Sequence, residues 1–200
     1  MDVTLEVARK AEWNRYDALY TGRVKLAGKG DSPYGIANHG SAALPILVDE
    51  YKARSICDVG TGNGQLCLDA IDRGVPKVCG VDFASEPDGA GVSWLKAPAH
   101  ALGLPDNAFE WVTAFDLLEH LLEEEIPEVL DEFARVASVG MAFSIAYTKS
   151  RDVLGGNLHA TIRPKEWWLE VLNGYGPVTE HLRTLRNKPL VKDYQFVTFR

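Results

Sequence analysis

The chain has 200 residues, 46% of them hydrophobic and 24% charged, which is the composition of one globular domain with a single large core. A formal net charge of -7 opposes non-specific binding to nucleic acids and anionic membranes, and no segment approaches the ~18 consecutive apolar residues of a membrane span. The first residues carry charges and lack the apolar centre of a signal peptide, so we expect a cytoplasmic protein.

Residues 1–53 precede the main pattern and are predicted to form an N-terminal helical cap or lid of the same domain. A helix is expected over about residues 4–20, where Trp13 and Tyr16 belong to an apolar stripe. Such a stripe is typical of a helix that docks on the core. A second helix is expected over about residues 45–53, and the glycine-bearing loop between the two helices is long for a compact domain.

Residues 54–200 alternate short apolar runs with segments of helical spacing and are predicted to form the core of the domain. Strands are expected at residues 54–59, 77–82, 109–116, 139–147, 178–185 and 193–200. Helices are expected at residues 63–73, 127–138 and 164–174. Alternating strands and helices favour parallel pairing, whereas the last two runs are joined by a link too short for a helix. The sequence therefore predicts an α/β fold with a Rossmann-like, doubly wound, mostly parallel sheet and an antiparallel C-terminal strand pair.

The crossover after the second predicted strand is the least regular part of this pattern. A connecting helix is expected somewhere in residues 83–98. Pro87, Gly89 and Gly91 disfavour a long one, because proline and glycine both lower helix stability.

The stretch ICDVGTGNGQL, residues 56–66, carries the first indication of a ligand. Alternate glycines between a strand and a helix let a ligand approach the backbone near a helix N-terminus. Such a turn alone is compatible with NAD, FAD or a phosphate, but the dinucleotide fingerprint requires glycine where this chain has Gln65. The second predicted strand ends in Asp82, which could accept hydrogen bonds from both hydroxyls of a ribose. A nucleoside-containing ligand is therefore expected.

With these features the sequence resembles the class I S-adenosylmethionine-dependent methyltransferases. The matching pieces are DVGTGNG (58–64), VDFA (81–84), AHALGLPDNAFEWVTAFDLLEHL (99–121) and the closing strand pair. The resemblance covers about residues 54–200 and depends on the order and spacing of these pieces. It implies S-adenosylmethionine as the cofactor and methyl transfer as the activity.

The resemblance also implies a set of cofactor contacts along the carboxyl ends of the strands. The methionine part would face Asp58, Gly60, Gly62 and Gly64, the ribose Asp82, the adenine Phe83, His100 and Ala101, and the transferred methyl group Phe115 and Asp116.

Three residues are candidates for a direct part in catalysis: His120, His159 and Tyr34. A general base is useful only where the acceptor arrives protonated, as a hydroxyl does. His120 and His159 both follow strands at the ligand end of the sheet, although either could instead cap or pack. Tyr34 belongs to the loop that could close over the cofactor. His181, in a late strand, is interpreted as structural.

No metal site is predicted from the sequence. Cys57, Cys67 and Cys79 have no CxxC spacing and no neighbouring histidine pair, so we expect reduced thiols in the core. The acidic run at residues 122–128 is interpreted as a solvated helix start that the helix dipole favours.

Missing motifs narrow the methyl acceptor. The chain lacks the [DNS]-P-P-[YF] motif of amino-methylating DNA enzymes and has no cysteine after a proline for attack on cytosine. We therefore expect transfer to O or N of a small molecule or sugar. Two alternatives remain: a macromolecular acceptor such as a modified nucleotide in DNA or RNA, which would dock at the basic segment 183–192, and a non-catalytic cofactor-binding subunit. A nicotinamide-dependent dehydrogenase is disfavoured by Gln65 and by the closing strand pair.

Overall fold

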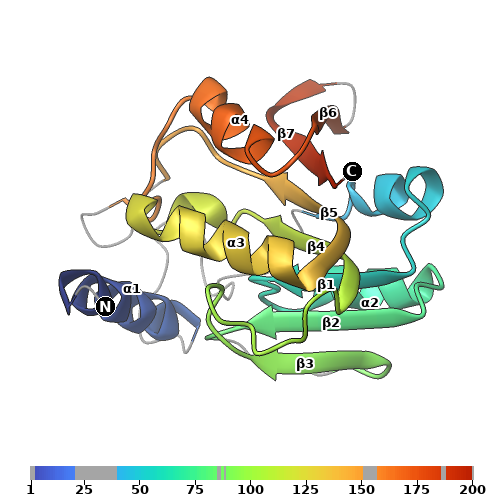
Figure 1. The fold of residues 1–200 in the computed structure, drawn as a ribbon, viewed down its shortest axis with the longest axis horizontal. Helices are drawn as coiled ribbons and strands as arrows, with labels where there is room; N and C mark the ends of the chain where they lie inside the picture. Colours follow the sequence, from blue (N-terminus) through green and yellow to red (C-terminus); the bar gives the residue numbers. More distant parts are fainter. Residues whose placement is uncertain are drawn as a thin grey trace.

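A seven-stranded sheet organises the computed structural model, which describes residues 3–20, 40–84, 87, 89–150, 157–185 and 188–199 (Figure 1). The order of the strands across the sheet is β3-β2-β1-β4-β5-β7-β6. Their bounds are β1 Ser55–Val59, β2 Lys77–Asp82, β3 Val92–Lys96, β4 Phe109–Phe115, β5 Ala137–Ser144, β6 Val178–Leu185 and β7 Lys188–Thr198.

The pairing confirms the predicted mixed sheet. β1 runs parallel to β2 and to β4, and the β2–β3 and β4–β5 pairs are also parallel. β7 is antiparallel to both β5 and β6. The chain winds outward from β1 in one direction and from β4 in the other, so the order reverses between these two neighbours. In open α/β sheets a ligand crevice forms at the carboxyl ends of the strands at such a switch point.

Helices cover both faces of the sheet, and their bounds are α1 Val3–Tyr20, α2 Gln65–Asp72, α3 Ile126–Val136 and α4 Lys165–Asn173. Short turns of other helical types occupy Ile46–Glu50, Leu118–His120 and Glu123–Glu125. In the described part of the chain, none of the helices combines the length and the apolar character that crossing a membrane requires.

Two apolar layers form the core, one on each face of the sheet. α3 buries Val129, Leu130 and Phe133 on one face, and α4 adds the fully buried Trp168. On the opposite face, α2 and the segment around Leu47 pack against β1 and β2. Cys57, Cys67 and Cys79 are buried free thiols in these layers, as predicted.

α1 lies apart from both layers, at the end of the sheet to which β2 and β3 point (Figure 1). The buried side chain of Arg9 fixes it there, because its Nε donates to Glu125 Oε1 at 2.7 Å and its Nη2 contacts Glu128 at the start of α3. The interpretation of residues 122–128 as a solvated run was therefore wrong for Glu125, which is buried in this ion pair. The position of Arg9, 116 residues earlier in the chain, decides its environment.

Two other expectations differ from the structure. The segment expected to hold a crossover helix contains strand β3, because Val92 and Trp94 can pack on the edge of β2 while the left-handed Gly91 (φ 83°) interrupts any helix before them. The helix expected over residues 45–53 is a single five-residue π-helical turn, Ile46–Glu50, after which the chain enters β1.

Candidate active site

A pocket opens at the carboxyl ends of β1, β2 and β4, at the switch point of the sheet. Gly60, Asp82 and Asp116 line its floor, and residues of α1 cover it. The cavity beneath α1 has a volume of about 90 Å³, which is less than the roughly 300 Å³ of the smallest usual ligand sites. A nucleoside-sized ligand therefore requires α1 or its side chains to move.

The backbone conformation of the loop after β1 explains why glycines occupy alternate positions in it. Gly60, Gly62 and Gly64 have φ values of 73°, 58° and 76°, the left-handed region that other L-residues avoid. A Cβ atom on Gly64 would also lie 2.4 Å from the ring of Trp94. The N–H groups of Gly60 and Thr61 donate to Val81 O at 2.8 and 3.1 Å, which joins the loop to the end of β2.

Asp82 is the charged group that this loop orients. It is buried, at 6% exposure. Its Oδ2 accepts from Gly62 N at 3.0 Å and its Oδ1 from Ala84 N at 2.8 Å. These two backbone donors fix the orientation of the carboxylate at the floor of the pocket.

Aromatic side chains from α1 fill the space next to Asp82. The ring of Trp13 stacks on Phe83 at 5.8 Å between centroids and on His100 at 6.1 Å. Tyr16 meets Phe83 edge to face. The sequence assigned Trp13 and Tyr16 to docking on the core. They line the pocket instead. Their helical spacing predicted that they share one face of the helix, but spacing alone does not show which part of the protein that face packs against.

His120 and His159 come together at the rim of the pocket, with ring centroids 4.8 Å apart. His120 lines the pocket from the short turn after β4, and Tyr16 Oη contacts its Nδ1 at 2.5 Å. Asp116, just before this turn, has a φ of 57° and accepts from Ser144 Oγ at 3.1 Å. A non-glycine residue with positive φ is a sparsely populated conformation that concentrates at functional sites.

The remaining predicted site residues are distributed around this centre. Ala101 follows His100 in the loop after β3, and its N–H donates to Pro98 O. The ring of Phe115 turns to the opposite side of the sheet, where it packs edge to face on Tyr194. His181 packs against Phe196 in β7. Tyr34 lies outside the described residues.

Glu119 is a potential site residue that the sequence analysis did not single out. It is fully buried, its Oε1 accepts from Ala146 N at 2.9 Å, and it lies beside both histidines. Its place in an acidic, leucine-rich segment resembles a helix surface, so nothing local in the sequence distinguishes it.

A family model described as a methyltransferase domain matches residues 57–145. Residues 57–145 therefore carry a methyltransferase domain, in agreement with the resemblance of the sequence to the class I S-adenosylmethionine-dependent methyltransferases. Among curated proteins, none matches its sequence.

Solved methyltransferases share the fold. The 1,6-didemethyltoxoflavin-N1-methyltransferase of Burkholderia thailandensis, solved with 1,6-didemethyltoxoflavin and S-adenosylhomocysteine, is 18% identical with a TM-score of 0.65, over 96% of this chain and 88% of that chain. The magnesium protoporphyrin IX methyltransferase of Synechocystis PCC 6803 with S-adenosylhomocysteine is 15% identical with a TM-score of 0.62, over 99% of each chain. The same enzyme solved with S-adenosylmethionine is 14% identical with a TM-score of 0.63, over 99% of this chain and 96% of that chain.

This methyltransferase uses S-adenosylmethionine as its methyl donor. The polar groups of the pocket fit such a ligand, because a fixed carboxylate on Asp82 lies between a glycine loop and the aromatic ring of Phe83. The cavity is large enough for the cofactor only after α1 or its side chains move.

Asp58, at the carboxyl end of β1, is a buried carboxylate with a raised pKa. Its pKa is raised to about 7, mainly by burial and in smaller part by the neighbouring charge of Asp82, while the hydrogen bonds from the hydroxyls of Thr113 and Thr61 oppose the shift. Thr113 Oγ1 donates to Asp58 Oδ1 at 2.7 Å. An unfolded aspartate titrates near 3.9, so between about pH 4 and pH 7 the folded chain binds more protons at this site than the unfolded chain.

The substitution Asp58→Asn should change how stability depends on pH. Because the folded pKa of Asp58 is raised, its contribution to stability falls as pH rises from about 4 to about 7 and is constant above that. Asp58→Asn removes this loss. As the pH rises from about 4 to about 8, the free energy of unfolding of the variant should therefore increase by roughly 2 to 4 kcal/mol relative to that of the parent. Urea denaturation at several pH values measures the gain.

The matched control is Asp72→Asn, which removes an exposed carboxylate at the end of α2. Exposed carboxylates contribute little to stability, so its denaturation curves should follow those of the parent. Parallel curves for Asp58→Asn and the parent across this range would contradict the raised pKa.

Proposed function

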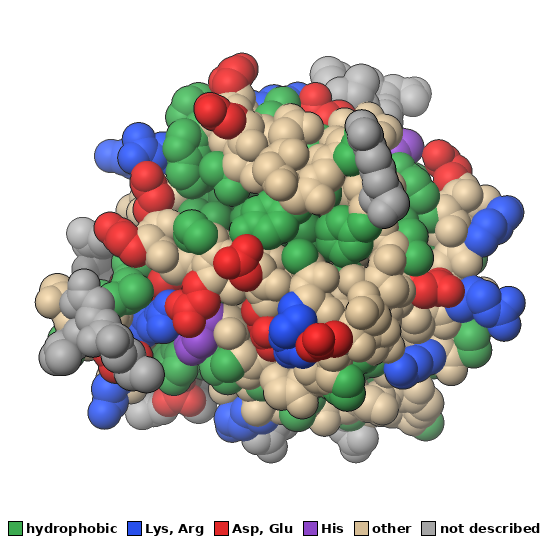
Figure 2. All heavy atoms as spheres, viewed as in Figure 1, with side chains coloured by type: hydrophobic (Ala, Val, Ile, Leu, Met, Phe, Trp, Pro, Cys, Tyr) green, Lys and Arg blue, Asp and Glu red, His purple; other side chains and the backbone are tan. Residues whose placement is uncertain are grey.

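We propose that this methyltransferase transfers the methyl group of S-adenosylmethionine to an oxygen or nitrogen atom of a small molecule or sugar. The observation that carries the proposal is the small size and cover of the pocket: side chains of α1 lie over the switch-point crevice and join the strand ends in lining a cavity of about 90 Å³. Two further observations support it. Acidic and basic side chains are interspersed on the face of Figure 2, without a continuous basic stripe, and the formal net charge is -7.

The similar enzymes support the same class of acceptor. Their names identify 1,6-didemethyltoxoflavin, which is methylated at N1, and magnesium protoporphyrin IX. Both are small molecules. At identities of 18% and 15% these proteins establish the fold alone, so the acceptor of this chain is inferred from its own pocket.

In this proposal the residues at the strand ends hold the cofactor. Asp82 accepts hydrogen bonds from the ribose hydroxyls, Phe83 and His100 lie against the adenine, and the loop from Asp58 to Gly64 surrounds the methionine part. The cofactor supplies a methyl group already activated by its sulfonium. The protein then has to align an acceptor atom with the S–CH3 bond and exclude water.

The histidine pair is proposed to assist removal of the acceptor's proton. His120 is part of the pocket wall and His159 contacts it from the loop after β5. A hydroxyl acceptor must lose its proton as the new bond forms, and imidazole titrates in the range where such assistance is effective. Residues 1–53, with α1 as their described helix, are proposed to act as the lid that closes the pocket over both substrates.

The substitution Asp82→Ala should weaken binding of S-adenosylmethionine by about 1 to 3 kcal/mol, because two ribose hydroxyls lose their acceptor. Isothermal titration calorimetry measures the affinity, and thermal melting verifies that the variant folds. Asp72→Ala removes a carboxylate from the exposed end of α2 and should bind the cofactor as the parent does. Unchanged affinity in Asp82→Ala would remove Asp82 from the ribose site.

The acceptor class can be tested with methyl-labelled S-adenosylmethionine and pools of hydroxyl- and amine-bearing metabolites, including sugars. We expect label in a small product, at a rate that changes little between about 50 and 200 mM salt. A nucleic-acid acceptor held by several phosphate contacts would lose about 10³-fold or more in affinity over that range. Label found only in RNA or DNA, with such salt dependence, would show the proposed acceptor class to be wrong.

Replacing either histidine should slow methyl transfer without weakening cofactor binding. His120→Ala and His159→Ala are each expected to lower turnover by roughly 10²-fold, because the acceptor's proton has no assisted route. Glu124→Gln, an exposed change in the neighbouring turn, should retain full turnover. If both histidine variants turn over at the parental rate, catalysis depends on alignment alone.

A further inference from the structure

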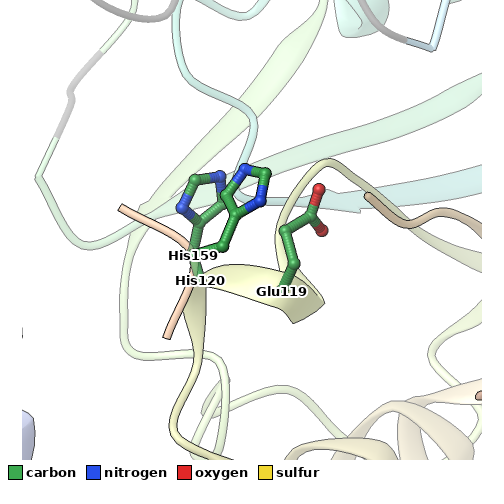
Figure 3. Close-up of side chains that lie close together, drawn as sticks. All are labelled: Glu119, His120 and His159. Carbon is green, nitrogen blue, oxygen red and sulfur yellow. The ribbon is translucent and has the colours of Figure 1, made fainter. Parts of the chain in front are cut away.

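Three potential metal ligands meet beside the cofactor pocket: Glu119, His120 and His159 (Figure 3). One ligand atom from each residue can be chosen so that all three lie within 4.8 Å of one another. Glu119 and His120 are neighbours in the turn Leu118–His120, whereas His159 comes from the loop between β5 and α4. In Figure 3 the two imidazole rings lie next to each other, with the carboxylate of Glu119 on one side.

Backbone carbonyls orient both imidazole rings. His159 Nδ1 lies 2.5 Å from Thr148 O, and His120 Nδ1 lies 3.0 Å from Leu158 O. A carbonyl oxygen can only accept, so the contact of His159 with Thr148 O places the hydrogen on Nδ1 and the lone pair of a neutral ring on Nε2. Nδ1 of His120 lies near both Leu158 O and Tyr16 Oη, and donation to Leu158 O gives the same tautomer. Tyr16 Oη donates to the same Leu158 O at 3.1 Å, which satisfies this arrangement. Histidines that bind metals are typically oriented in this way, by a hydrogen bond from the second ring nitrogen.

The carboxylate of Glu119 is also held in position. Its Oε1 accepts from Ala146 N at 2.9 Å, and its own backbone carbonyl accepts from Thr161 N at 3.0 Å. Thr161 Oγ1 donates to Leu121 O at 2.7 Å. These bonds fasten the loop that carries His159 to the turn that carries Glu119 and His120, so the three side chains are positioned by the fold.

We propose that Nε2 of His120, Nε2 of His159 and a carboxylate oxygen of Glu119 bind one divalent first-row transition metal ion. Two imidazoles and one carboxylate are a ligand set of catalytic zinc and related metal sites, in which further positions remain for substrate or water. Magnesium is a poor match, because it prefers oxygen ligands.

The distances are compatible with small side-chain movements. Ligands that lie 2.0–2.1 Å from a tetrahedral metal ion are about 3.3 Å from one another. One ring nitrogen of each histidine and one carboxylate oxygen of Glu119 already lie within 4.8 Å of one another, so each pair of these atoms must approach by about 1.5 Å at most on binding. Rotation about the side-chain torsions can provide this.

The place of the site indicates its use, in an inference that rests on the proposed function. His120 lines the pocket next to Asp116 and Leu117, so an ion on its Nε2 would lie at the edge of the space assigned to the acceptor. In this arrangement the two histidines assist loss of the proton as ligands of the ion and not as bases, because an acceptor hydroxyl that binds the ion has a lowered pKa and releases its proton to solvent. Its oxygen then forms the new O–CH3 bond as the S–CH3 bond breaks, leaving a neutral thioether. This favours oxygen over nitrogen as the methylated atom.

Cobalt(II) titration of the full-length chain, treated with chelator and free of cofactor and acceptor, tests the site directly. Visible absorption should rise to one equivalent of Co²⁺ per chain, with competition by Zn²⁺ and little by Mg²⁺. His120→Ala, His159→Ala and Glu119→Gln should each weaken Co²⁺ binding by at least about 100-fold, the upper end of the effect of removing an outer-shell partner. Affinity should also fall as the pH drops below about 6.5, where the imidazoles protonate.

Two matched controls separate loss of a ligand from general damage. Glu124→Gln removes an exposed carboxylate from the adjacent turn, and His181→Gln removes a histidine that packs on Phe196. Both should bind Co²⁺ as the parent does. Circular dichroism without metal verifies the fold. If Glu119→Gln fails to fold because its side chain is buried, the half-buried His159→Ala remains a valid test.

The outcomes separate the metal site from the proposed function. Absence of stoichiometric Co²⁺ binding by the parent, or parental affinity in a folded His159→Ala, would overturn the site. Loss of Co²⁺ binding in the three ligand variants would support the metal site even if no acceptor is methylated. Methyl transfer that is unaffected by chelator would overturn the catalytic use of the ion and leave the proposed methyltransferase function intact.

Discussion

The central constraint on this protein is the parallel pairing of β1 with both β2 and β4. The hydrogen bonds of β1 fix the carboxyl ends of three strands at one edge of the sheet. The glycine loop after β1, Asp82 at the end of β2 and Asp116 after β4 therefore meet in one pocket. These residues are far apart in the sequence and meet only because the strands pair. The N–H groups of Gly60 and Thr61 also hydrogen-bond to Val81 O at the end of β2.

Within the described residues, the buried side chain of Arg9 helps to hold α1 over that pocket. Arg9 joins α1 to Glu125 at the start of α3, which directs Trp13 and Tyr16 onto the strand ends. A buried charge pair contributes little net stability but specifies position, because either partner left alone would be costly. The same contacts that shape the pocket also reduce it to about 90 Å³. Ligand entry and the position of α1 are consequently linked.

Regular periodicity was sufficient for most of the fold. The strands from β1 to β7 other than β3, and helices α1 to α4, were predicted because apolar residues recur with the period of each element. β3 was missed because Trp94 and its neighbours form a half-exposed edge, in which packing on Gly80 and Gly64 decides the conformation. Glu125 was misassigned for a related reason, since its partner Arg9 is remote in sequence. Local patterns carry no information on such partners.

By itself, the sequence determined the alternation of strands and helices and the glycine turn after the first strand, because both follow from residue spacing over a few positions. It indicated the methyl donor through the resemblance of several segments, in their order and spacing, to the class I S-adenosylmethionine-dependent methyltransferases. Only the tertiary structure brought His159 to His120 and Glu119, turned the ring of Phe115 away from the pocket and laid Trp13 over Phe83. Those arrangements depend on contacts between segments tens of residues apart, which the packing of the sheet and its helices decides.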